Sequence, residues 1–218
     1  MNGGPGTALK LGFALMVLVA AAAGWWAYST RTELAQKEAE VAAAQALAAK
    51  AASDGTERVK AREAELRASL QKEIAGRDVE INRLKDQLSV RVLDRILFRS
   101  GSSAILPAGE AVLAKLAPTL AKGSEYIRVE GHTDNVPIGE ALRDTYASNW
   151  ELSTARAASV VRYLQQRGKI GPERLEAVGF GEYRPVDSND KPDTRQRNRR
   201  VEIVLTAKEA AKPATQKP

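Results

Sequence analysis

Two ionisable side chains with contrasting surroundings are the most informative chemical features of this 218-residue sequence. Asp134 follows an alternating apolar stretch, Tyr126 to Glu130, and is therefore expected just beyond the end of a strand. In α/β sheets that edge is a frequent place for ligands. Arg156 lies in a predicted helix, within the arc that also holds Leu152 and Val160. A guanidinium there needs an acceptor, because desolvating it unpaired costs several kcal/mol.

The position of Arg156 has two structural explanations beside the functional one. Its long stem could carry the charge out to water, or the guanidinium could pair with a structural carboxylate. The functional explanation is a site shared with Asp134, but periodicity alone does not bring the two side chains together. Four further Arg residues open a predicted strand near the end of the chain, and a solvated run of charge is the usual explanation for such a cluster: Arg195, Arg197, Arg199 and Arg200.

The sequence holds little that could support catalysis. It has one His, His132, and no Cys, which excludes disulfides, thiolate metal ligands and a thiol nucleophile. Glycan cleavage would need a second acid beside Asp134, and none is marked out. The net charge of +6 is spread along the chain without interleaved aromatic residues, unlike a nucleic-acid interface. We therefore expect a non-enzymatic protein without cofactor, metal or nucleic-acid partner.

These side chains are predicted to belong to one α+β domain, residues 90–206. Residues 148–151 predict a helix start, because Ser148 and Glu151 fit a capping box. A second helix is predicted over 107–121. Apolar runs and alternation predict four strands around these helices, over residues 90–98, 126–130, 175–180 and 199–205.

A helical stalk is predicted over residues 31–89. Its first part is rich in Ala, Ser53–Thr56 interrupts it, and Thr56 could cap a second helix. In that second helix apolar residues recur close to a heptad: Val59, Leu66, Leu70, Ile74, Ile81, Leu84 and Leu88. The pattern favours a homodimeric coiled coil, although Gly76 interrupts it. A single solvated helix, or one folded back on the domain, is the alternative.

Residues 1–30 are predicted to form a membrane anchor. Leu11–Thr30 carries no charge and, as a helix, would be about 30 Å long, the thickness of a bilayer core. Trp25, Trp26 and Tyr28 stand where an interfacial aromatic belt is expected. The alternative is a cleaved signal peptide, and both imply export. The tail, residues 207–218, is predicted to be disordered.

Several ordered motifs resemble the OmpA-like peptidoglycan-binding domain, and in particular its MotB branch. They are Phe98–Ser102, Val129–Asn135, Asn149–Ser153 leading to Arg156 and Ala157, Val178–Gly181 and Asn198–Ile203. The resemblance implies a two-layer α+β sandwich of order βαβαββ. It also implies a shallow pocket for the diaminopimelate residue of the peptidoglycan stem peptide.

The resemblance assigns roles to residues of this pocket. It implies that Asp134 holds the ammonium of the ligand and Arg156 its carboxylate, which suits a zwitterion. Thr133, Asn135, Leu152 and Asn198 are expected as secondary contributors, and Arg199 could add to the field at the carboxylate. Many relatives have an acidic residue where this chain has Arg99, so the resemblance assigns no side-chain contact to that loop.

The whole sequence thus predicts a tether between membrane and cell wall. It would be a single-pass inner-membrane protein with its C-terminal domain in the periplasm, or a periplasmic protein after cleavage. An envelope complex could supply a further partner protein. A flagellar-motor stator subunit is the alternative function. It is disfavoured because Leu11–Thr30 lacks the acidic group that ion conduction requires.

Overall fold

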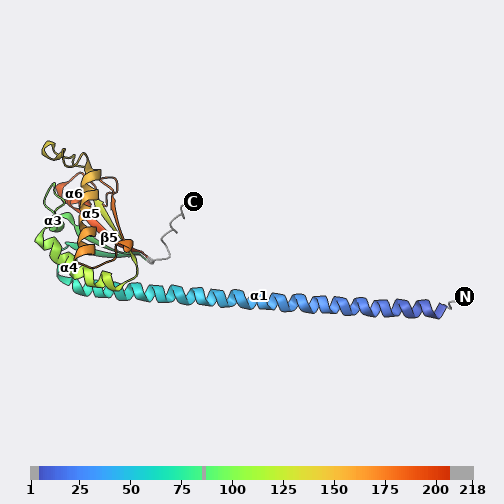
Figure 1. Cartoon of the computed structure of the whole chain (residues 1–218). Coiled ribbons are helices and arrows are strands. Elements are labelled where there is room, and N and C mark those ends of the chain that lie inside the picture. Colours follow the sequence, from blue (N-terminus) through green and yellow to red (C-terminus); the bar gives the residue numbers. More distant parts are fainter. Residues whose placement is uncertain (1–4, 85–86, 207–218) are drawn as a thin grey trace. The chain divides into compact units, whose positions relative to one another are not determined.

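The computed structural model describes residues 5–84 and 87–206, without the side chains of residues 5–15, 17 and 84. The predicted tail, 207–218, lies outside the described residues. The chain forms two compact units, Met1–Asp54 and Gly55–Pro218. Figure 1 labels several of their helices and one strand.

From Pro5 on, the first unit is helical, because α1 runs without interruption over Pro5–Ser69. The predicted break at Ser53–Thr56 is wrong, and Thr56 caps no separate helix. A glycine inside a helix costs only about 1 kcal/mol relative to alanine. The Ala-, Glu-, Lys- and Arg-rich segments on both sides are strong helix formers and outweigh it. The boundary between the two units nevertheless falls within this stretch, at Asp54 and Gly55.

The predicted membrane segment, Leu11–Thr30, is helical in its backbone. Six of its side chains, those of residues 11–15 and of Val17, lie outside the description. Among the residues that are described, no helix is both long and apolar enough to cross a membrane. The anchor therefore stays a prediction.

In the second unit, a strand hairpin stands where the sequence predicted the end of a helical stalk and the start of the first strand. After α1, the short helix α2 (Gln71–Ala75) leads to β1 (Val79–Leu84) and β2 (Gln87–Leu93), which pair antiparallel. The chain reverses at Gly76 and Arg77, the latter with a positive φ of 59°. A heptad-like stripe and the alternation of a strand overlap over so short a run, and here alternation decides the structure.

The apolar stripe of the predicted coiled coil packs within the domain instead. Leu66 and Leu70 are fully buried in its core, and Val59 and Ile74 pack against that core. This is the folded-back alternative for residues 55–75. The domain starts at Gly55 rather than at residue 90, and the stripe no longer argues for a dimer.

The sheet has five strands in the order β1-β2-β5-β3-β4. The strands after the hairpin are β3 (Tyr126–His132), β4 (Leu175–Gly179) and β5 (Arg200–Thr206). Only β3 and β4 are parallel, and all other neighbours are antiparallel. The predicted α+β class is confirmed. The predicted order βαβαββ lacked the hairpin strand β1.

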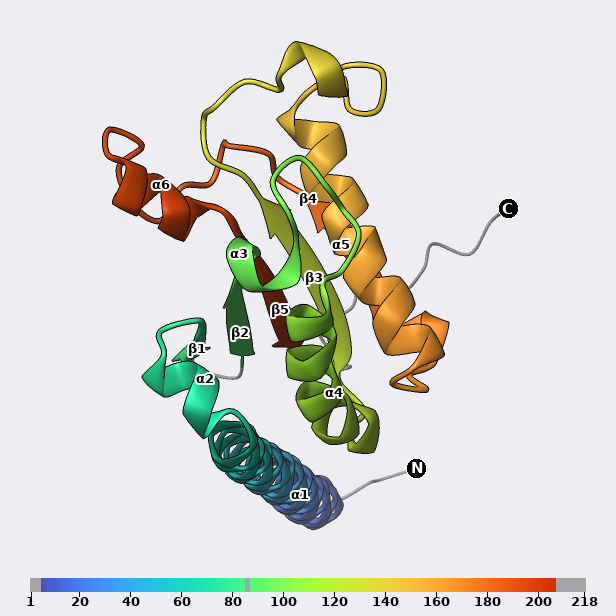
Figure 2. The same ribbon diagram turned by 90° about the vertical axis from the view of Figure 1, so that its left-hand side faces the viewer.

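The helices α4 (Pro107–Lys122) and α5 (Asn149–Gln166) cover one face of the sheet (Figure 2). Alternate strand residues point into this layer, for example Val201, Ile203 and Leu205 on β5. Short helices complete the unit: α3 (Asp94–Leu97), η1 (Glu140–Leu142), η2 (Pro172–Arg174) and α6 (Pro192–Asn198). The predicted strand 90–98 therefore ends early, because Asp94–Leu97 turns into α3.

Helix α5 is fixed at its start by the predicted capping box. The Ser148 backbone N–H donates to Glu151 at 2.7 Å, and the Trp150 N–H donates to the Ser148 hydroxyl at 3.1 Å. Two strand glycines let the helix approach the sheet. A Cβ on Gly131 would lie 2.1 Å from the Ser153 carbonyl oxygen, and one on Gly179 would lie 2.1 Å from Thr154 Oγ1.

Candidate ligand-binding site

A pocket of about 770 Å³ opens where β3 ends. Four segments line it: α3 with the loop that follows, the chain from Thr133 to Leu142, the first turns of α5, and α6 with Arg199. Among its lining residues are two buried acids and two arginines that pair across these segments. They are Asp94, Asp134, Arg156 and Arg199.

Arg156 is 3% exposed, as its place in the apolar arc predicted. Its Nη1 lies 3.1 Å from Asp94 Oδ1, and its Nε donates to the Ser102 carbonyl oxygen at 2.9 Å. Its guanidinium carbon also lies 5.2 Å from the centre of the Phe98 ring. The structural acceptor is therefore Asp94, not Asp134. The Arg156 Nη2 donates weakly to the Arg99 carbonyl oxygen, at 3.4 Å. These contacts use three of the five N–H groups of the guanidinium, and the other two have no partner in the described part of the chain.

Asp94 is the acidic site residue that sequence reasoning missed. It is 6% exposed, and burial raises its pKa from 3.8 to about 6, although Arg156 and Arg199 act to lower it. The residue sits in α3, far from Arg156 in sequence, inside the run 90–98 that was predicted to be a strand. An acid inside an apolar stretch was the only available signal, and it could have been recognised as a candidate partner for Arg156.

Asp134 occupies the predicted place at the end of β3 and is 5% exposed. Its carboxylate forms an ion pair with Arg199 and accepts a hydrogen bond from the Val136 backbone N–H at 3.2 Å. The Arg199 side chain is 30% exposed, so this pair forms the more open side of the pocket. The two ion pairs together bring no net charge to the site.

Two further polar atoms of the pocket are buried without a hydrogen-bond partner in the described structure. They are the hydroxyl oxygen of Thr133 and the amide nitrogen of Gln196. Unpaired buried polar groups are costly, and such groups in a cleft can be satisfied by a ligand or by water. Gln196 carried no signal in the sequence.

The structure brings five of the seven predicted site residues to this pocket. Thr133, Asp134, Leu152, Arg156 and Arg199 line it. Asn135 and Asn198 do not.

Asn198 is fully buried and holds a loop together. It accepts from the backbone N–H groups of Val186 and Asp187 at 2.9 and 3.0 Å and donates to Asn189. These contacts give the side chain a structural role outside the pocket lining.

His132 does not face this pocket. It is 2% exposed and stacks on Phe180 with 5.3 Å between ring centres. Neither ring nitrogen has a hydrogen-bond partner among the described residues, although Nε2 lies 3.9 Å from the Glu130 carboxylate. Burial, assisted by Arg200, lowers its pKa to about 3. The imidazole is therefore neutral at physiological pH.

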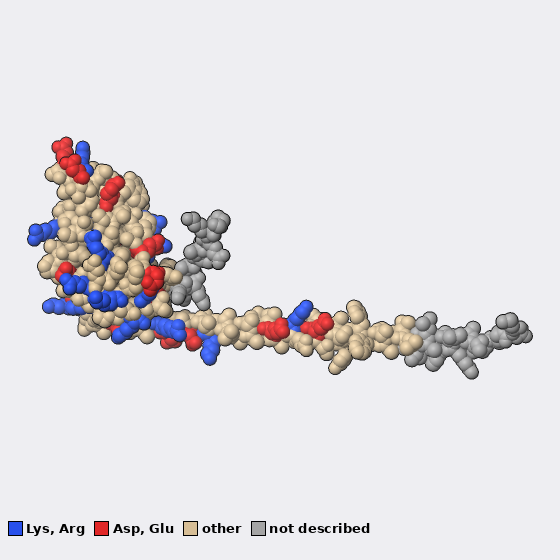
Figure 3. Space-filling model, in the orientation of Figure 1, with Lys and Arg blue, Asp and Glu red and all other residues tan. Residues whose placement is uncertain are grey.

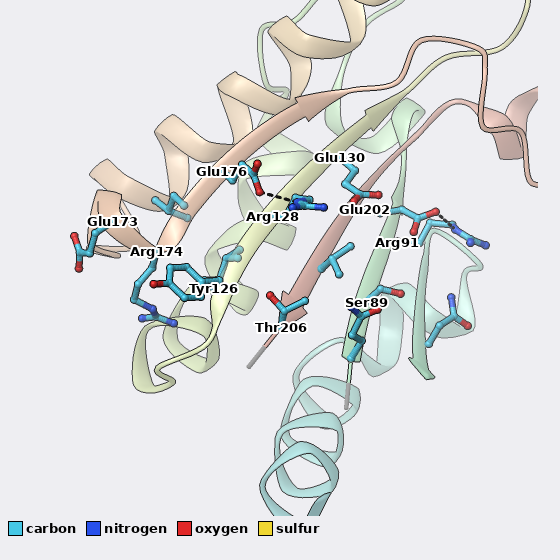
Figure 4. A pocket seen from close by; sticks show the side chains of 15 residues that line it. Ser89, Arg91, Tyr126, Arg128, Glu130, Glu173, Arg174, Glu176, Glu202 and Thr206 are labelled. Atoms are coloured by element: carbon cyan, nitrogen blue, oxygen red, sulfur yellow. Dashed lines mark hydrogen bonds and ion pairs between the residues drawn. The ribbon is translucent and has the colours of Figure 1, made fainter. Parts of the chain in front are cut away.

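A second hollow, of about 820 Å³, lies on the sheet face that α4 and α5 leave open (Figure 4). Its charged side chains pair across strands, with Arg128 2.6 Å from Glu176 and Arg91 3.2 Å from Glu202. On the surface, positive and negative side chains are likewise interspersed (Figure 3). The pocket beside Asp134 is thus the better candidate for a ligand-binding site, since two N–H groups of Arg156 there have no partner in the described part of the chain.

Comparison with known proteins places this geometry in a family. Residues 97–199 match the model of the OmpA family. Motility protein B of Bacillus subtilis is 32% identical over 134 residues, which cover 61% of this chain and 50% of that protein. The chain spans about half the length of the curated relatives it matches first.

Two solved structures share the fold. A MotB-like protein from Desulfovibrio vulgaris has a TM-score of 0.66 and 28% identity, covering 76% of this chain and 99% of that one. The cell wall anchor of the type VI secretion system from Pseudomonas aeruginosa has a TM-score of 0.60 and 34% identity, covering 65% and 96%. The chain belongs to the OmpA family, and its domain is MotB-like.

Proposed function

We propose that this domain binds peptidoglycan without cleaving it and so tethers its chain to the cell wall. The supporting observation is the pocket with two carboxylate–guanidinium pairs, Asp94–Arg156 and Asp134–Arg199. The proposal also draws on the likeness to a cell wall anchor. The ligand would be the diaminopimelate residue of the stem peptide.

The charges suit the amino-acid end of that residue. Its ammonium group would approach Asp134, and its carboxylate would take the two free N–H groups of Arg156. Both arginines are already held by acids, so the site is organised before the ligand arrives. The two ion pairs offer both signs of charge side by side, which favours a zwitterion over a simple anion or cation, since each pole finds an opposite partner. Thr133 would donate or accept at the same end.

Binding to purified cell-wall sacculi tests this assignment. We expect Asp134→Asn and Arg156→Gln each to weaken retention about 10- to 100-fold, the range for a lost charged hydrogen bond. Retention should also fall at high salt, because one side of the site is open to solvent. The readout is the bound fraction after sedimentation of the sacculi.

A matched control is available on the far face of the sheet. Arg128→Gln and Glu176→Gln remove an exposed ion pair from the same domain, and they should leave retention unchanged (Figure 4). Circular dichroism must show that all four variants are folded. Equal retention of Asp134→Asn, Arg156→Gln and the unmodified chain would refute the assigned site.

Membrane attachment belongs to the same proposal. Residues 1–30 would hold the chain in the inner membrane, with the domain in the periplasm, as the uncharged run Leu11–Thr30 indicates. Fractionation of cells gives the test. Recovery of the chain with membranes after a carbonate wash is expected, whereas release into the periplasmic fraction would favour the cleaved alternative.

A stator role is the second candidate, favoured by the likeness to Motility protein B. Leu11–Thr30 contains no acidic residue that could carry an ion. We therefore expect no rescue of swimming when the chain is expressed in a strain that lacks its own stator protein. Restored motility would replace the tether by a motor function.

A further inference from the structure

The exposed large apolar side chains of the domain are few and lie in neighbouring segments. In the described part of the second unit they are Val136, Trp150, Tyr183 and Val186. Val136 lines the pocket beside Asp134. Exposed apolar groups gathered at one place on a domain commonly mark a binding surface.

Trp150 and Tyr183 form a stacked pair. Their ring centres are 5.1 Å apart and their planes meet at 22°. Trp150 is 45% exposed and Tyr183 is 64% exposed. Each ring covers one face of the other, so the exposed surface includes the outer faces. We call this pair the aromatic ledge.

Hydrogen bonds fix the aromatic ledge beside the pocket. Asn149, which lines the pocket and precedes Trp150, donates to Glu182 and, at 3.0 Å, to the Val136 carbonyl oxygen. Glu182 precedes Tyr183. The backbone N–H of Thr133 donates to the Gly181 carbonyl oxygen at 2.9 Å. Trp150 therefore follows a residue that lines the pocket, and Tyr183 follows a residue that is hydrogen-bonded to it.

We propose that the aromatic ledge stacks on a pyranose ring of the glycan strand while the pocket holds the stem peptide. This inference rests on the proposed function. A sugar ring has apolar C–H faces and a polar rim. Flat aromatic surface beside the Glu182 carboxylate offers a match to both.

The linkage between stem peptide and glycan makes such a contact feasible. An extended peptide advances about 3.5 Å per residue. Two residues between diaminopimelate and the sugar would therefore place the sugar roughly 10 Å from the pocket. Trp150 directly follows the pocket-lining Asn149, so the aromatic ledge is a candidate contact for a sugar at that distance.

Trp150 can report the contact directly. The chain has three tryptophans, so Trp25→Phe together with Trp26→Phe leaves Trp150 as the single indole. The probe is a solution of glycan strands from which an amidase has removed every stem peptide. We expect these strands to shift and quench the emission in a saturable way. Asp134→Asn should not change this titration.

Substitutions separate the aromatic ledge from the pocket. We expect Trp150→Ala and Tyr183→Ala to weaken binding to intact sacculi roughly five- to tenfold. Binding of a free stem tripeptide should stay the same. Trp150→Phe should keep most of the affinity. Tyr126→Ala, a half-buried aromatic in the hollow on the open sheet face, is the control and should have no effect.

The two proposals fail in different ways. Unchanged emission on addition of bare glycan, or unchanged sacculus binding in both alanine variants, would overturn the aromatic ledge. Failure of the tripeptide to bind the unmodified chain would overturn the pocket assignment instead. Equal loss of sacculus and tripeptide binding in Trp150→Ala would show that the rings only support the pocket, and would also overturn the inference.

Discussion

At the scale of single residues, the Asp94–Arg156 pair has the larger desolvation cost of the two ion pairs in the site. Both side chains are almost fully buried, at 6% and 3% exposure. Burying two charges costs several kcal/mol per ion, and their attraction offsets this only when the geometry is good. The pair is therefore better suited to fixing the guanidinium in place than to adding stability.

The titration of Asp94 gives a prediction about stability. Burial raises its pKa to about 6 in the folded chain, so the folded state binds this proton more tightly than the unfolded state. Its contribution to the free energy of unfolding is present at low pH and is lost as pH rises from about 4 to above 6. Asp94→Asn removes this dependence. The loss should be on the order of 1–3 kcal/mol.

Urea unfolding of the unmodified chain and of Asp94→Asn at a series of pH values measures this pH dependence of stability. Arg156, Arg199 and Asp134 all act on Asp94, and they are present in both proteins. Glu130, whose pKa burial also raises, contributes equally to both. The difference between the two curves therefore isolates Asp94. Parallel curves over this range would contradict the raised pKa.

Part of the site could be predicted at this scale and part could not. Asp134 and Arg156 stand out because one follows a strand and the other lies on an apolar face. Asp94 and Gln196 do not, because their role arises only when distant segments meet in the fold. Asn198 shows the opposite case, since a residue of the family motif holds a loop outside the pocket lining.

At the scale of elements, the close packing of α5 on the sheet depends on two positions without a side chain. Gly131→Ala would place a methyl group 2.1 Å from the Ser153 carbonyl oxygen and 2.9 Å from its carbon. Backbone on both sides cannot yield, so helix and strand must separate. Overpacking of this kind costs about 1–3 kcal/mol.

Thermal unfolding tests the packing of α5. We expect Gly131→Ala to lower the melting temperature by several degrees. Sacculus binding should also weaken, because α5 carries Arg156. Gly139→Ala is a suitable control for the melting temperature alone, since its added methyl group would have nothing within 4 Å but the residue lines the pocket. A melting temperature equal to that of the control would show that the contact relaxes easily.

The regular elements were largely predictable, and their exceptions have a local cause. The capping box predicted the start of α5, and alternation predicted β5. Strand β1 and the first residues of β2, up to residue 89, were assigned to a helix because Ile81, Leu84 and Leu88 fit a heptad as well as two short strands. The pairing of β2 with β5 favours the strands over a helix, and this pairing between distant segments cannot be predicted from a local sequence pattern.

At the scale of the whole molecule, the start of the folding unit decides which fragment is stable. Leu66, Leu70, Val79 and Ile81 are all buried at 6% exposure or less. Each buried side chain of this size contributes about 1.5–3 kcal/mol. Together they approach the total stability of an ordinary domain, about 5–15 kcal/mol.

Two fragments make this measurable. Residues 55–206 should unfold cooperatively, whereas residues 90–206, the domain as predicted from sequence, should be unfolded or aggregate. Circular dichroism and urea titration compare them under the same conditions. A cooperative transition of equal midpoint in the shorter fragment would mean that the helix and hairpin are additions to a domain that is already complete.

The burial of Leu66 and Leu70 also has a mechanical meaning. A tether bears load, and tension on α1 enters the domain through these two leucines before it reaches the strands. The next element of the sheet along the chain is β1, an outer strand that is joined to the sheet on one side only. Stretched in a single-molecule pulling experiment, the domain should lengthen first by peeling off this strand. The strands beside the pocket would stay intact, so the domain would keep its ligand after β1 has detached.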